Sequence, residues 1–176
     1  QGAFYNFIIE CSKDSLFQQL CPLSFSKKER GEYEELVLRF FAFSESYLKF
    51  KHDVAPFLDE YVKKNSKSFN KDELLKRFNA MCDFVHKYFS PTYFARRPND
   101  SITPRVRFEA ISVGVYLALQ QNPTLAPKSV DWLHSVEFKR QTTTDASNNP
   151  GRLKSRIEFV RDCLLGINKT FSYDND

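Results

Sequence analysis

Apolar residues recur every three or four positions along nearly all of the chain, and no stretch alternates apolar with polar residues as a half-buried strand does. The widest apolar stripe lies within residues 32–50. Residues 105–121 are apolar on almost every side, which is typical of a helix buried at the centre of a protein. No segment repeats at a fixed period, so a solenoid is not expected. The pattern predicts one compact all-α domain over residues 1–176.

Capping residues divide this pattern into about seven helices. Asp53 and Asn70 are suited to begin helices, and Gly166 is suited to end the last one. Thr103 is expected to cap a helix that has Pro104 at its first position. The expected helices are 3–12, 32–50, 54–64, 71–88, 104–121, 128–138 and 150–165, with a further turn or short helix at 14–20 and a connection at 23–28.

The composition is typical of a globular protein, and together with the absence of long apolar runs it bears on where in the cell the protein is expected. Of the 176 residues, 41% are hydrophobic and 27% are charged, which excludes both a disordered chain and a membrane-embedded one. No apolar run approaches the roughly 18 residues of a membrane span. The chain begins with Gln1 and carries no signal peptide, so we expect a cytoplasmic segment of a longer protein that has no contact with membranes.

The residues that most often carry chemistry are scattered. The four cysteines include no closely spaced pair, so we expect reduced, buried thiols and neither a disulfide framework nor a zinc site. His52, His86 and His134 are isolated from one another, and no phosphate-binding loop, zinc-protease motif or nucleophile elbow is present. The sequence predicts no catalytic residue, no metal site and no cofactor in this chain.

The net charge is +4, a mild excess of basic residues that is compatible with contact to nucleic acid. Lysines and arginines are therefore the remaining candidates for a functional site. Those of the last helix are expected to face away from its apolar stripe of Leu153, Ile157 and Val160, where they could bind DNA phosphates. The alternative is a solvent-exposed helix face on which they pair with Glu158 and Asp162. The candidates for DNA binding are Arg152, Lys154, Arg156 and Arg161 on this helix, and Arg96 and Arg97 in an earlier loop. Arg96 and Arg97 form a second basic cluster with Arg105 and Arg107.

Arg39 lies within the widest apolar stripe, where a buried and unpaired charge would be costly. The simplest expectation is an ion pair with Glu35, one helical turn earlier. The alternative is a guanidinium that points to a partner domain or a ligand. Both interpretations make Arg39 and Glu35 structural or interdomain residues.

Several segments resemble one bacterial family. The run from Glu35 to Phe43, followed by Tyr47 and by residues 57–61, is similar to the start of the helical region of the GmrSD/SspE-type defence proteins. Their N-terminal domain is ParB-like. The other segments that resemble this family are Gly2-Ala3-Phe4, Arg107-Phe108-Glu109-Ala110, Thr142–Thr144 and Arg152–Arg156.

This resemblance implies the α-helical part of a restriction or phage-defence protein. The family's nucleotide-handling motif, Asp-Gly-Gln-Gln-Arg, and its His-Asn-His nuclease domain are both absent from the sequence. We therefore expect a non-catalytic accessory domain that packs on a ParB-like nucleotide-binding domain of the same protein and contacts the DNA backbone. The alternative is a helical protein–protein interaction module with no role in nucleic-acid binding.

Overall fold

The computed structural model describes residues 2–143, 148–167 and 170–175. Within these ranges the chain forms nine α-helices and two short 3-10 helices, and none of the described residues belongs to a β-strand. The all-α prediction is confirmed, with nine helices in place of about seven. None of the described helices is both long enough and apolar enough to cross a membrane.

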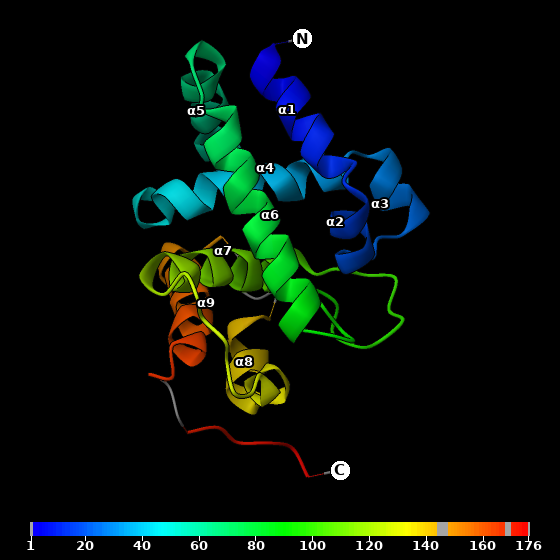
Figure 1. The fold of residues 1–176 in the computed structure, drawn as a ribbon, viewed down its shortest axis with the longest axis vertical. Helices are drawn as coiled ribbons and strands as arrows, with labels where there is room; N and C mark the ends of the chain where they lie inside the picture. The colour runs from blue at the N-terminus through cyan, green and yellow to red at the C-terminus, as the bar shows by residue number, and fades with distance from the viewer. Residues whose placement is uncertain (1, 144–147, 168–169, 176) are drawn as a thin grey trace.

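The helices cross one another in several directions. In Figure 1, α1 and α5 lie towards the N-terminal end and α8 and α9 towards the other end, while α4 and α7 lie across the molecule between them and α6 runs along its length. In chain order the elements are α1 (Ala3–Ser12), α2 (Ser15–Leu20), α3 (Phe25–Glu29), α4 (Glu32–Ser46), η1 (Tyr47–Lys49), α5 (Val54–Lys67), α6 (Lys71–Tyr88), α7 (Arg105–Gln121), η2 (Asp131–His134), α8 (Val136–Gln141) and α9 (Pro150–Leu164).

Helix α7 occupies the centre, because it packs against α4, α6 and α9. This central position explains why α7 carries apolar residues on every side, and most of these residues are fully buried. Gly114 lies where α7 crosses α9. A Cβ atom added there would lie 2.6 Å from the Cβ of Val160 and 3.0 Å from the carbonyl oxygen of Ile157. The absence of a side chain at Gly114 therefore allows the two helices to approach closely.

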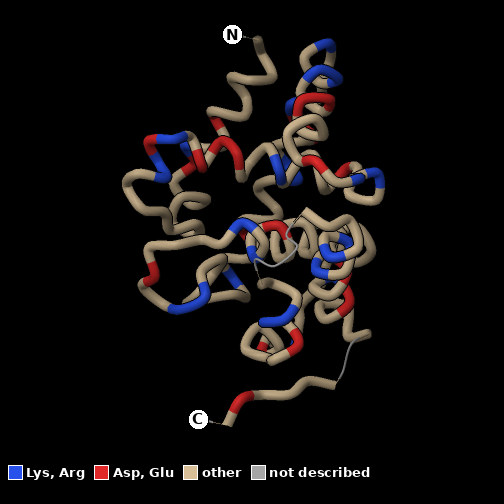
Figure 2. The backbone as a smooth tube through the Cα atoms, turned by 180° about the vertical axis from the view of Figure 1, so that it is seen from behind, with Lys and Arg blue, Asp and Glu red and all other residues tan. Residues whose placement is uncertain are grey.

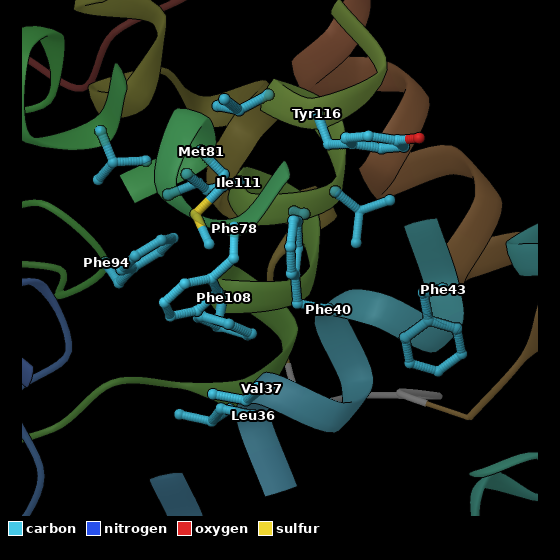
Figure 3. Close-up of a cluster of buried hydrophobic side chains, with 14 of the residues drawn as sticks. Leu36, Val37, Phe40, Phe43, Phe78, Met81, Phe94, Phe108, Ile111 and Tyr116 are labelled. Carbon is cyan, nitrogen blue, oxygen red and sulfur yellow. The ribbon is translucent and has the colours of Figure 1, made fainter. Parts of the chain in front are cut away.

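Aromatic rings fill much of the space between α4, α6 and α7, as the close-up of the core shows (Figure 3). Phe40 of α4 meets Tyr116 of α7 edge-to-face, with 6.2 Å between the ring centroids. Phe94, from the loop after α6, lies 4.9 Å from Phe108 by the same measure. Tilted and edge-on contacts of this kind are the favoured geometries of aromatic pairs, so the 18 phenylalanines of the sequence are used mainly as core residues.

Three predicted boundaries differ from the structure. The connection expected at 23–28 contains α3, a short helix with no buried residue, which explains why it leaves no apolar periodicity in the sequence. The helix expected over 32–50 ends at Ser46 and continues as the 3-10 turn η1, after which the buried Phe50 turns the chain towards α5. Helix α5 continues to Lys67, three residues beyond its expected end.

The helix expected over 128–138 is broken at Ser135. The Ser135 hydroxyl donates to the carbonyl of Trp132 (2.6 Å) and accepts from the backbone N–H of Phe138 (3.1 Å), so it ends η2 and caps α8. The prediction that Thr103 caps α7 is wrong. Its hydroxyl donates to the carbonyl oxygen of Pro22 (2.9 Å), and the helix begins at Arg105.

Other helix ends follow the sequence. Asp53 and Asn70 cap α5 and α6 as expected, and Gly166 follows α9 with a left-handed φ of +74°. The polar loop expected at 141–149 is described only in part, because residues 144–147, including Thr144, lie outside the described ranges.

Candidate functional site

Two arginines and two glutamates form an ion-pair network between α4, α7 and α9. Arg39 of α4 donates through Nε to Glu35 Oε1 (2.9 Å) and through Nη1 to Glu109 Oε1 (2.6 Å). The other oxygen of Glu109 accepts from Arg156 Nη1 of α9 at 3.0 Å. The expected pairing of Arg39 with Glu35 is confirmed, and the network shows that Arg39 also reaches the central helix. These contacts fasten three helices together at one point.

The prediction that Arg156 faces solvent is wrong. The residue is 1% exposed, and its guanidinium points into the protein towards Glu109. Burial lowers the pKa of Arg156, although the carboxylate of Glu109 opposes this effect. The sequence contained a signal for this position, because Arg156 follows Leu153 by three residues and precedes Val160 by four. This spacing places it on the apolar stripe of α9 and not opposite to it.

Arg105, at the start of α7, is bound by a carboxylate of α4. Its Nε and Nη2 atoms each lie 2.7 Å from one oxygen of Glu32, which is the bidentate geometry favoured by guanidinium and carboxylate. Burial alone would raise the pKa of Glu32, but the hydrogen bond and the charge of Arg105 outweigh burial and lower it. This pair joins the N-terminal ends of α4 and α7.

Two of the cations expected to bind DNA are neutralised on α9. Arg161 Nε lies 2.8 Å from Asp162 Oδ1, and its Nη2 lies 3.8 Å from Glu158 Oε2. Lys154 Nζ is 4.0 Å from Glu158 Oε1. For Lys154 and Arg161 the structure therefore matches the alternative interpretation, which is a solvent-exposed helix face with ion pairs.

Two of the three remaining candidates, Arg96 and Arg152, meet at the end of α8. Arg96 Nη2 donates to the carbonyl of Thr142 (3.4 Å), while Arg152 Nη2 donates to the carbonyl of Arg140 (3.4 Å) and to Thr143 Oγ1 (3.0 Å). These acceptors are neutral, so the charges of both arginines are not cancelled. We call the group formed by Arg96, Arg107, Arg140 and Arg152 the α8 arginine cluster.

Arg107 is the buried member of the α8 arginine cluster. It is 4% exposed, and its guanidinium carbon lies 5.1 Å from the centroid of the Phe138 ring. Its Nε is covered and has no hydrogen-bond partner. Burial and then the positive charge of Arg96 lower the pKa of Arg107 to about 10. This pKa still leaves the guanidinium protonated at neutral pH.

No member of the α8 arginine cluster forms an ion pair with another residue in the described parts of the chain. Figure 2 shows the face that is turned away in Figure 1, with basic positions in the loop after α6, on α8 and on α9. Arg97, an exposed residue, follows Arg96 in that loop. The arrangement concentrates positive charge from four segments, the loop after α6, α7, α8 and α9, around the last turn of α8.

Sequence reasoning identified Arg96, Arg97 and Arg152 in this region and grouped Arg107 with Arg96 and Arg97 as a basic cluster, but it left Arg107 and Arg140 out of the DNA-binding candidates. Arg107 stands in an almost wholly apolar helix, which suggests a structural residue, and Arg140 is one basic residue in a short helix. Arg107 and Arg140 come together because α7 and the loop after α6 contact α8. The positions of these residues in the sequence do not indicate that contact.

Among the residues that the structure describes, the titratable groups used most often in catalysis are not assembled into one site. The four cysteines are buried and form no disulfide, and burial raises the pKa of Cys11 to about 12 and that of Cys82 further, so both remain thiols at neutral pH. The described residues contain no group of three or more histidine, cysteine, aspartate or glutamate side chains that could hold a metal ion. The three histidines are exposed.

A groove of about 780 Å³ lies between α6, the end of α7 and residues 123–126. Its walls are mainly apolar, and the guanidinium of Arg77 lies over the ring of Tyr116 at 5.5 Å on one side of it. Exposed Ala80 of α6 also lines it. The groove shares no residue with the α8 arginine cluster and has a different chemical character.

No family model, no curated protein and no solved structure matches this chain.

Proposed function

We propose that this chain is a non-catalytic helical accessory domain of a GmrSD/SspE-type defence protein, which packs on a ParB-like domain of the same protein and binds the phosphate backbone of DNA. The observation that carries DNA binding is the accessible part of the α8 arginine cluster, which is Arg96, Arg140 and Arg152, together with the exposed Arg97 beside it. Arginines whose charges are not cancelled by carboxylates are available to neutralise phosphates, and guanidinium geometry suits phosphate oxygens.

Some of the segments that resemble that family lie close together in the folded chain. Three of the resembling segments contribute Arg39, Glu109 and Arg156, and these residues meet in one buried ion-pair network. They are separated by 70 and 47 positions in the sequence. The segments on which the proposed relationship rests are therefore parts of one structural unit.

The test of DNA binding uses variants that leave the fold intact. Arg97 and Arg140 are both exposed, so the double variant Arg97→Ala/Arg140→Ala removes two charges without disturbing the core. Each lost phosphate contact reduces the log–log dependence of affinity on salt by about 0.9. We expect the double variant to bind duplex DNA more weakly and with a salt slope about 1.8 shallower than that of the wild type.

The matched control is Lys154→Ala/Arg161→Ala, which removes the same charge from residues that already pair with Glu158 and Asp162. We expect this control to leave the salt slope nearly unchanged. Equal effects of the two double variants would mean that only the net charge matters. Wild-type protein that shows no salt-dependent binding to duplex DNA would contradict the proposal itself.

The apolar groove favours a second candidate function, a protein-interaction module. On this hypothesis the groove receives the ParB-like domain, and Ala80 lies where a charge would obstruct docking. We expect Ala80→Arg to abolish co-purification with a separately expressed ParB-like domain and to leave the helical circular-dichroism signal unchanged. The control is Ala3→Arg, an exposed position at the start of α1. Co-purification that survives Ala80→Arg would exclude the groove as the contact.

A further inference from the structure

Arg107 lacks the partner that a buried charge normally has. The residue is 4% exposed, and its guanidinium forms no hydrogen bond or ion pair with any residue that the structure describes. The other two buried arginines, Arg39 and Arg156, both bind Glu109. A buried charge without compensation lowers stability, and such departures from good packing are concentrated at functional sites. We therefore expect an anion to bind beside the Arg107 guanidinium.

The surroundings of Arg107 determine what kind of anion is suitable. Its guanidinium rests on the face of Phe138, while Arg96 is held one turn further along α8 by the carbonyl of Thr142. Both arginines therefore lie against the last turn of α8, and after burial the positive charge of Arg96 is the second cause that lowers the pKa of Arg107. Two neighbouring arginines together carry a charge of about +2, which matches a dianion better than a monoanion.

We propose that Arg107 and Arg96 form a site for one terminal phosphate monoester, namely the 5′-phosphate at the end of a nucleic acid. A monoester phosphate is close to dianionic at neutral pH, whereas each phosphate within a nucleic-acid strand is a diester with a single charge. The small exposed fraction of Arg107 also favours the end of a strand, because a continuous duplex backbone cannot follow an arginine into the protein. Arg140 and Arg152, at the same end of α8, contact the nucleotides that follow.

This inference rests on the proposed binding of nucleic acid but concerns one group within it. The first measurement is thermal unfolding of the wild-type chain in inorganic phosphate and in sodium chloride of equal ionic strength. A ligand at 100 times its Kd raises the ratio of folded to unfolded protein about 100-fold. For a chain of this size we expect the midpoint temperature to rise by about 5–10 °C in phosphate and not in chloride.

The decisive variant is Arg107→Met, which keeps a long side chain over Phe138 but removes the charge. We expect its midpoint temperature without phosphate to equal or exceed that of the wild type, and the stabilisation by phosphate to disappear. A purely structural arginine would give a lower midpoint temperature instead. Arg96→Met, at an exposed position, must also weaken the stabilisation by phosphate and provides the test if Arg107→Met does not fold. The control Arg30→Met, at an exposed position after α3, must retain it.

The second measurement identifies the source of the phosphate. We expect a short oligonucleotide with a 5′-phosphate to bind about tenfold more tightly than the same oligonucleotide without it, which corresponds to one good charge-assisted contact. Arg107→Met removes this difference. A phosphoserine peptide that binds as tightly as the phosphorylated oligonucleotide would overturn the assignment to a nucleic-acid end.

The two proposals fail in different experiments. If duplex DNA binds with the expected salt slope but phosphate does not stabilise the wild type, the phosphate site is refuted and the proposed function stands. If phosphate and the 5′-phosphorylated oligonucleotide bind through Arg107 but duplex DNA does not bind, the backbone-binding function is refuted and the phosphate site stands.

Discussion

Glu109 holds two arginines at once, from α4 and from α9, and its side chain is only 5% exposed. Glu109→Gln removes the charge that both arginines share, and breaking a buried ion pair in this way costs about 3–5 kcal/mol. The matched variant is Glu35→Gln, which affects only Arg39 through a pair within one helix and at a side chain that is 33% exposed. We expect it to cost about 0.5 kcal/mol. Urea unfolding of both variants measures this difference, and similar losses would show that Glu109 has no special role.

Glu32 gives the stability of the protein a defined dependence on pH. Its pKa in the folded state is lowered from the ordinary 4.5, so the unfolded chain binds the proton more readily. The stabilisation by Glu32 is therefore complete above about pH 5 and is lost as the pH falls through the lowered pKa.

We expect the difference in unfolding free energy between wild type and Glu32→Gln to be constant from about pH 5 to 7 and to shrink below pH 4.5. Chemical denaturation at a series of pH values measures it. The control Glu34→Gln is at a half-buried position on the same helix with no hydrogen bond or ion pair to a described residue, so its difference should not follow this course. A constant difference for Glu32→Gln down to pH 3 would contradict the effect of Arg105.

Single side chains were predictable where the interaction is local. The spacing of four residues between Glu35 and Arg39 was sufficient to predict their ion pair, because such residues are neighbours on a helix. Glu109 was not predictable as the second partner of Arg39, since it lies on another helix 70 positions after Arg39. The same limit applies to the α8 arginine cluster, which exists only after α7 and the loop before it have packed against α8.

The crossing of α7 and α9 provides a prediction about the helices. Gly114→Ala would place a Cβ atom 2.6 Å from the Cβ of Val160, so one helix must move. Overpacking of this kind costs about 1–3 kcal/mol, more than the helix propensity of alanine returns. Adding Val160→Gly removes both the Cβ and the Cγ1 that lie 2.6 Å away, and we expect the double variant to lose less stability than the sum of the two single variants. If urea unfolding shows that the losses of unfolding free energy of the two single variants add strictly, the two helices move apart at this point without strain.

Helices with an apolar face were predictable, and those without one were not. Helix α6 lies where its cap, Asn70, and its apolar spacing place it. Helix α3 was missed because it buries no residue. Ser135 was not recognised as a cap because serine is also found inside helices, and only the contacts of its hydroxyl in the folded chain distinguish the two cases.

The chain should unfold as one unit, because its two ends are joined through α7. Helix α4 contacts α1 and α5 on one side and α7 on the other, and α7 in turn contacts α9. Trp132, the one tryptophan of the sequence, reports on the far end, where its ring lies 5.4 Å from that of Phe138 and 6.3 Å from that of Phe159, between centroids. Circular dichroism reports on all helices together. We expect urea unfolding followed by Trp132 fluorescence and by circular dichroism to give the same midpoint, which is the behaviour of a two-state domain. If the helical signal is lost at a lower urea concentration than the fluorescence changes, α1 and α5 unfold separately, and the single domain predicted from the sequence is wrong.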